Sequence, residues 1–304
     1  MARRTGLMTL SPALLPLLRE LGDLKRIRSA GRDGTVATRL FEMAWSAWLA
    51  GEDRDTVAMR AMAQALAACR LGDLDHAKLG ELGMSGDDRR TALERAVDEI
   101  AAPLPDDHAA ALKTYLDAPL SPPGPLPDAI AALRHQPRAG VTGPGRPRIM
   151  LQPEENHAEH SFLVALYASL LAPFYGAPPA RSFWHGMVHH LHSAAMPDAG
   201  YTGEVLLGDR LGSVIDRARE LALAQLPDKP AAVSREHLLE IADDTTPAAR
   251  AFHAGDVIDR VVEIEQHLKR GAVTMDVVLG DYGLVHDGPV KPFHDRVLAE
   301  TGLP

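Results

Sequence analysis

The stretch NHAEHSFLVALYASLLAPFY, residues 156–175, predicts a long helix that lies in the protein core. Apolar side chains recur in it at every third or fourth position, which is the period of an α-helix. His160 shares one face with Val164, Tyr167 and Leu171, so a histidine continues the strip that should face the core. Because a buried imidazole needs a polar partner, this helix is the starting point for a functional site.

The same helical period governs the rest of the chain. It is clear in residues 40–50, 57–71 and 90–102 and in the run 249–269. Strand signals are nearly absent, because valines are scattered, aromatic residues make up only 5% and no Asn-Gly or Asp-Gly turn separates alternating segments. The sequence therefore predicts an all-α fold.

The composition narrows the classes of partner. The formal net charge is -9 and no basic run occurs, so nucleic acid is not an expected partner. The single cysteine, Cys69, excludes an internal disulfide and a thiolate metal cluster, which suits a reducing cytoplasm. No window reaches the roughly 18 uninterrupted apolar residues of a membrane helix. We expect a cytoplasmic protein without a membrane partner, and the sequence leaves a monomer and a homo-oligomer both open.

Prolines and glycines cluster near the middle of the chain, in APLSPPGPLPD (118–128) and GVTGPGRPR (140–148). Proline fixes its own φ and lacks an N–H donor, so such clusters do not fit the interior of a packed bundle. We expect a helical N-terminal domain over residues 1–118, a linker over residues 119–147 and a second domain over residues 148–304.

The two halves of the chain share a pattern. Residues 34–53 run parallel to residues 156–175 in their small and apolar positions, with Thr38 opposite His160. The N-terminal half is either a degenerate copy of the second half or an unrelated alanine-rich helical domain. Since it lacks the histidines of the second half, we expect no chemistry from it.

Three segments of the second half concentrate groups that can bind a metal. They are ENHAEHS, HGMVHHLHS and FHAGDVIDR, and they supply His157, His160, His189, His190, His192, His253 and Asp256. Residues three apart lie on one helical face and can aim at one point. Imidazole and carboxylate ligands suit manganese, cobalt, iron or zinc.

Each of these residues also has a simpler explanation, a buried hydrogen bond or ion pair. For Asp256 the partner would be Arg260, one helical turn further on. The three segments together favour a shared site.

The run PEENHAEHSFLVALYASLLA resembles the helix that opens many HD-domain proteins, the superfamily of metal-dependent phosphohydrolases, and in particular its 5'-deoxynucleotidase-like branch. The resemblance covers roughly residues 146–270. It implies an HD-like helical bundle in the C-terminal half. It also implies a divalent metal held by His160, by the pair His189 and His190, and by Asp256.

The sequence departs from the family pattern in its second motif. His190 stands where the family has an aspartate, and Ser193 stands where the branch has the acidic residue that activates water. Asp198 matches an aspartate further along this motif and is the expected catalytic residue. Arg146 or Arg148 matches an upstream arginine that contacts the phosphate of an anionic substrate.

Three functions follow from this pattern. The first is metal-dependent hydrolysis of a phosphate ester, for example a nucleotide, by metal-activated water. The second, implied by the inositol-oxygenase-like branch of the superfamily, is a dinuclear iron oxygenase with extra ligands from His157, His192, His237 and His253. The third is a non-catalytic binding or regulatory protein that keeps the helical pocket.

Overall fold

A computed structural model of the chain describes residues 10–269 and Lys291. These residues form helices and short bridges but no sheet, which confirms the prediction of an all-α fold. The α-helices are α1 (Leu15–Gly22), α2 (Val36–Leu49), α3 (Arg54–Leu71), α4 (His76–Glu81), α5 (Gly86–Ile100), α6 (Asp106–Lys113), α7 (Asp128–Leu133), α8 (His157–Tyr175), α9 (Pro179–Val188), α10 (Gly200–Leu207), α11 (Leu211–Leu223), α12 (Asp228–Glu240) and α13 (Pro247–Lys269). The 3-10 helices are η1 (Pro12–Leu14), η2 (Asp23–Lys25), η3 (Leu191–Ala194) and η4 (Gly208–Arg210). None of the helices in the described part of the chain is both long enough and apolar enough to cross a bilayer.

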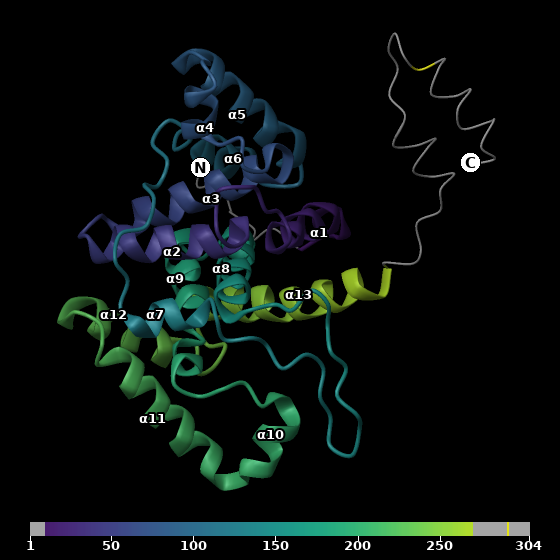
Figure 1. Cartoon of the computed structure of the whole chain (residues 1–304), viewed down its shortest axis with the longest axis vertical. Coiled ribbons are helices and arrows are strands. Elements are labelled where there is room, and N and C mark those ends of the chain that lie inside the picture. Colours follow the sequence, from purple (N-terminus) through teal and green to yellow (C-terminus); the bar gives the residue numbers. More distant parts are fainter. Residues whose placement is uncertain (1–9, 270–290, 292–304) are drawn as a thin grey trace, which may run out of the picture. The chain divides into compact units, whose positions relative to one another are not determined.

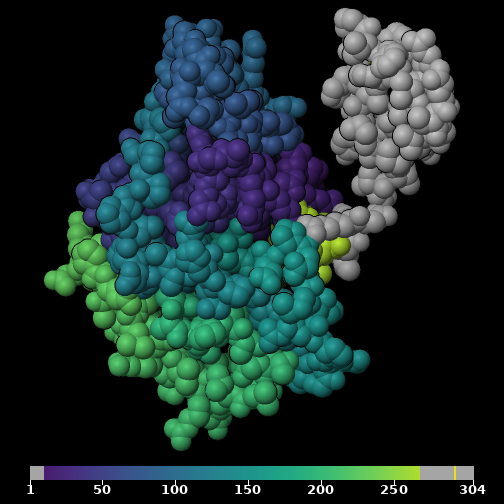
Figure 2. Space-filling model, viewed as in Figure 1, coloured from purple at the N-terminus to yellow at the C-terminus, as the bar shows by residue number. Residues whose placement is uncertain are grey.

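The chain divides near its C-terminal end. The described residues up to Val262 belong to one compact unit, and those from Glu263 onward belong to a second. In the first unit one hydrophobic core joins both halves of the sequence, for example Trp45 and Phe162. In Figure 2 the purple N-terminal residues lie directly on the teal residues of the second half. The segment 119–147, expected as a linker, contains α7, and this helix buries Ile130 in the same core.

Helix α8 is the centre of the first unit (Figure 1). All of its residues except Pro173 and Tyr175 are buried. Helix α9 packs along it, and α2 contacts it from the N-terminal half. A helix that is apolar on every side is stable only when other elements surround it, so α8 carries its histidines into the interior.

The start of α8 is fixed by polar contacts to the N-terminal half. The Asn156 side chain accepts from the backbone N–H of Glu159, and the Glu159 carboxylate accepts from the backbone N–H of Asn156, which is a capping box. The Thr35 hydroxyl, which also caps α2, donates to Glu159 at 2.7 Å, and the Thr38 hydroxyl donates to it at 3.3 Å. These contacts set the register of α8 and therefore the position of His160.

Two helix pairs contact each other in the core. Helix α2 packs on α3, α8 packs on α9, and the pairs meet where α2 contacts α8 and α3 contacts α9. This arrangement agrees with the parallel between residues 34–53 and 156–175, and the duplication stays a prediction.

Two glycines let neighbouring helices approach α8 closely. A Cβ atom on Gly186 of α9 would lie 2.3 Å from the backbone nitrogen of Ala165. A Cβ atom on Gly255 of α13 would lie 2.7 Å from the backbone nitrogen of Ala168. Both distances are too short for a carbon, so the α8 backbone and the partner helices fit together only with glycine here.

Replacing Gly186 with alanine should lower the free energy of unfolding by about 2–3 kcal/mol, because the methyl group pushes α9 away from α8. Urea unfolding of the variant would measure the loss. Gly212→Ala is the matched control, because Gly212 lies in α11 with open space around it and should tolerate or gain from alanine. Equal stability of the two variants would contradict the close approach.

Candidate metal centre

His160 lies in the first turn of α8, and its Nδ1 is engaged by an acidic residue of another helix. Its side chain is 1% exposed, and Nδ1 lies 2.7 Å from Oδ2 of Asp259 on α13. Because Asp259 also binds the Lys25 ammonium, it is a carboxylate and can only accept, so Nδ1 of His160 carries the proton. Burial lowers the pKa of His160 well below its ordinary value. The ring is therefore neutral, and its Nε2 presents a lone pair.

His189 presents the same atom from the opposite side. It follows the last residue of α9, and its Nδ1 donates to the carbonyl oxygen of Gly186 at 2.6 Å. Burial lowers the pKa of His189 to about 4, so this ring is also neutral and its Nε2 carries a lone pair. The two Nε2 atoms of His160 and His189 lie 3.2 Å apart. Neither of them has a proton to give to the other.

Asp256 lies beside His160. It lies on α13 and is buried, and its Oδ1 is 3.6 Å from Nε2 of His160. The Arg260 guanidinium contacts both carboxylate oxygens, with Nε 3.3 Å from Oδ1. The ion pair that the sequence offered as the simpler explanation is thus present. The Arg260 side chain is 62% exposed, so the guanidinium can move into solvent if another cation takes its place beside the buried Asp256.

His190 faces the same cluster, and its Nε2 is held by an arginine. A single ion could contact one nitrogen atom from each of three rings, His160, His189 and His190. However, Nη1 of Arg138 donates to Nε2 of His190 at 2.9 Å. Burial and the neighbouring histidines lower the pKa of His190 well below its ordinary value, so this ring is neutral and accepts.

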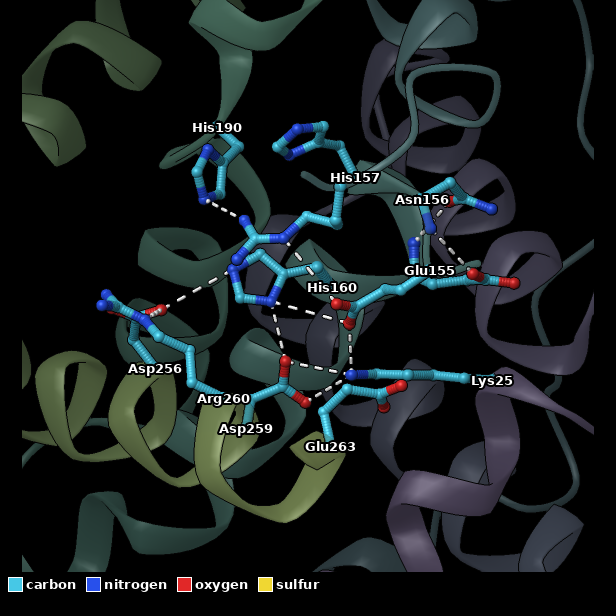
Figure 3. Close-up of polar contacts among 12 residues, drawn as sticks. Lys25, Glu155, Asn156, His157, His160, His190, Asp256, Asp259, Arg260 and Glu263 are labelled. Atoms are coloured by element: carbon cyan, nitrogen blue, oxygen red, sulfur yellow. Dashed lines mark hydrogen bonds and ion pairs between the residues drawn. The ribbon is translucent and has the colours of Figure 1, made fainter. Parts of the chain in front are cut away.

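Two buried carboxylates on another side of His160 bind the ammonium group of a lysine. Glu155, His160 and Asp259 converge. The Lys25 ammonium contacts Glu155 and lies 2.7 Å from Oδ1 of Asp259 (Figure 3). The Lys25 side chain is only 3% exposed. The N-terminal half, from which we expected no chemistry, therefore supplies a counter-ion that these two carboxylates share.

The remaining predicted ligands lie around this centre. His157 is fully buried, and its Nε2 lies 3.6 Å from Oδ2 of Asp198. Asp198 accepts from the backbone N–H groups of Ala139 and Gly200, so its carboxylate orders a turn. His192 is half-buried, and burial lowers its pKa to about 4. His253 lies outside the cluster, because its Nε2 contacts the carbonyl oxygen of Asp243.

The two arginines predicted to bind phosphate make other contacts. Arg148 donates from Nη1 to the carbonyl oxygen of Ala139 at 3.1 Å and from Nη2 to that of Ala199 at 3.4 Å. Arg146 is exposed in the turn that follows Gly143. The arginine that contacts a histidine of the cluster is Arg138, which the sequence analysis missed.

Four residues of the site were not predicted: Lys25, Arg138, Glu155 and Asp259. Asp259 had a usable signal, because it lies one helical turn after Asp256 and shares its face of α13. Glu155 directly precedes the helix cap in PEENHAEHS. Lys25 and Arg138 reach the site from distant segments, and no local pattern marks them.

Comparisons of this chain with models of protein families, with curated proteins and with solved structures found no match.

Proposed function

We propose that His160, His189 and Asp256 bind one divalent transition metal. The observation that carries this proposal is the 3.2 Å distance between two Nε2 lone pairs whose rings are both neutral. A proton between them would require an imidazolium ion, which burial disfavours at both residues. Two nitrogen ligands about 2.0–2.1 Å from one metal lie about 2.8–3.0 Å apart at an octahedral angle and about 3.3–3.4 Å apart at a tetrahedral angle. The donor set therefore fits a first-row ion.

The protein's own groups orient these donors. Asp259 accepts from Nδ1 of His160 and keeps the ring in the tautomer that leaves Nε2 available. The Gly186 carbonyl does the same for His189. Lys25 neutralises Asp259, so the outer carboxylate does not compete for the ion.

The function that this centre supports best is hydrolysis of a phosphate ester. A bound divalent ion would polarise a phosphoryl oxygen and lower the pKa of a bound water. Arg138 supplies a guanidinium beside the histidines, and its side chain is 20% exposed, so it can reach a phosphate. We propose that His190 positions this guanidinium rather than binding the metal. Because Ser193 is not a base at neutral pH, slow turnover is expected.

One observation favours a second candidate, a dinuclear iron oxygenase. Both ring nitrogens of His157 and the Nδ1 of His192 are buried without a hydrogen-bond partner in the described part of the chain. Orphaned buried nitrogens suit a ligand that the chain itself does not supply. Iron at two ions per chain would select this candidate over hydrolysis.

The test is metal analysis of the full chain purified without chelator, followed by chelator treatment and reloading with manganese, cobalt, iron or zinc. We expect about one ion per chain and hydrolysis of p-nitrophenyl phosphate or a deoxynucleoside monophosphate that chelation abolishes and metal restores. His253→Ala should keep the metal, since His253 lies outside the cluster. A chain that takes up no metal even on reloading would overturn both enzyme proposals.

A further inference from the structure

A second pair of buried histidines joins α9 to α12, and its α9 member lies one helical turn before His189. His185 on α9 is fully buried, and His237 on α12 is 3% exposed. Their Nδ1 atoms lie 2.8 Å apart. The Phe252 ring lies 6.4 Å from the His185 ring and 5.3 Å from the His189 ring, so an apolar side chain flanks both groups of histidines.

The hydrogen bonds of this pair run in one direction. Arg54 can only donate, so its Nη1 donates to Nε2 of His237 at 3.1 Å. Nδ1 of His237 then carries the proton and donates to Nδ1 of His185. Nε2 of His185 therefore carries a proton, and it lies 3.4 Å from Oε2 of Glu240. Glu240 accepts a hydrogen bond from Nε of Arg181 at 2.7 Å.

A pocket of about 240 Å³ opens beside these hydrogen-bonded residues. Its walls are Arg54, Asp55, Pro178, Arg181, Trp184 and His237. The Trp184 indole donates to the carbonyl oxygen of Arg54 at 3.0 Å and so holds the first turn of α3 against α9. The Arg54 guanidinium lies 5.8 Å from the centre of the Trp48 ring. Its place at the pocket wall is thus fixed by an aromatic ring and by His237.

The charge of Arg54 is compensated only at longer range, where its guanidinium is one of the groups that lower the pKa of Asp53. Glu240 neutralises Arg181, but no carboxylate of the described residues lies within ion-pair distance of Arg54. Burial lowers the pKa of His185 to about 4 and that of His237 to about 3, so both rings are neutral at physiological pH. One side-chain N–H group of Arg54 binds His237, and the others have no acceptor among the residues that the structure describes.

We propose that this pocket binds a small anion through Arg54, namely the phosphate or carboxylate group of a small molecule. A guanidinium with several available donors matches both groups. The pocket is smaller than the roughly 300–1,000 Å³ of sites for drug-sized ligands, so it fits a compact anion. His237 is a positioning residue, because it holds the guanidinium and does not itself donate to the ligand. This site is separate from the proposed metal centre and does not depend on it.

The test is calorimetric titration of chelator-treated protein at neutral pH with inorganic phosphate and, separately, with acetate or succinate. Arg54→Gln should weaken binding at least tenfold, and Arg54→Lys should give an intermediate loss because it keeps the charge without the fork. Arg70→Gln is the control on the same helix, since Arg70 is paired with Glu20 at the surface. His237→Gln should weaken binding while leaving the phosphate-to-carboxylate preference unchanged.

The outcomes separate the two sites. Binding that Arg54→Gln abolishes and Arg138→Gln leaves intact supports the pocket, and the better ligand names the anion. Binding that only Arg138→Gln abolishes assigns the anion to the histidine centre and overturns the proposal. No saturable binding by the wild-type chain, or equal binding by a folded Arg54→Gln variant, overturns it as well.

Discussion

Replacing Lys25 with methionine should lower the free energy of unfolding by about 3–5 kcal/mol. The Lys25 ammonium contacts the carboxylates of Glu155 and Asp259, and all three side chains are less than one-tenth exposed. Methionine keeps the length of the side chain but removes the ammonium that both buried carboxylates contact, so that Glu155 retains only the more distant Arg138 guanidinium, at 3.7 Å. A buried charge that loses its partner carries its full desolvation cost, which exceeds what a surface pair contributes.

Urea unfolding at neutral pH measures this loss. Lys113→Met is the matched control, because Lys113 pairs with Asp98 at the surface and should cost less than about 1 kcal/mol. Adding Asp259→Asn to Lys25→Met should recover part of the stability, because it removes one of the stranded charges. A loss as small as the control's would mean that water reaches the carboxylates and that the network does not stabilise the buried site.

The helical fold was open to prediction from sequence because periodicity is a local property. In residues 156–175 every third or fourth position is apolar, and α8 occupies almost this whole stretch. The elements that surround a helix cannot be predicted from such a local pattern. The sequence suggested one inward strip through His160, whereas α8 is buried on all sides. Helices that are far apart in the chain cover the remaining faces, and no local pattern records which helices those are.

The residues of the candidate site also differ in whether a local sequence pattern marks them. His160, His189 and Asp256 were predicted from helical spacing and from the resemblance to HD-domain proteins. The structure places His189 and Asp256 each next to His160, and their role as metal ligands stays a prediction. Arg138 and Lys25 were missed, because each comes from a segment whose own pattern gives no reason to approach a histidine. The proline-rich region was expected to separate two domains, yet α7 within it packs on the common core. Proline content marks where helices stop, but whether the chain between them packs depends on long-range contacts.

The largest functional effect is expected for His189→Ala, which should abolish metal binding and lower kcat for phosphate-ester hydrolysis by about 10³-fold, the equivalent of about 4 kcal/mol. His189 suits this test because its removal leaves no buried charge behind. Its Nδ1 contacts only the carbonyl oxygen of Gly186, and its Nε2 faces that of His160. The variant should therefore fold, and lost activity can be assigned to the lost ion. Metal content, kcat and urea unfolding are measured on the same preparation, with His253→Ala as the control that keeps both metal and rate. A His189→Ala chain that stays loaded and active would remove this residue from the centre, whereas one that stays loaded but inactive would assign it a role in the reaction rather than in holding the ion.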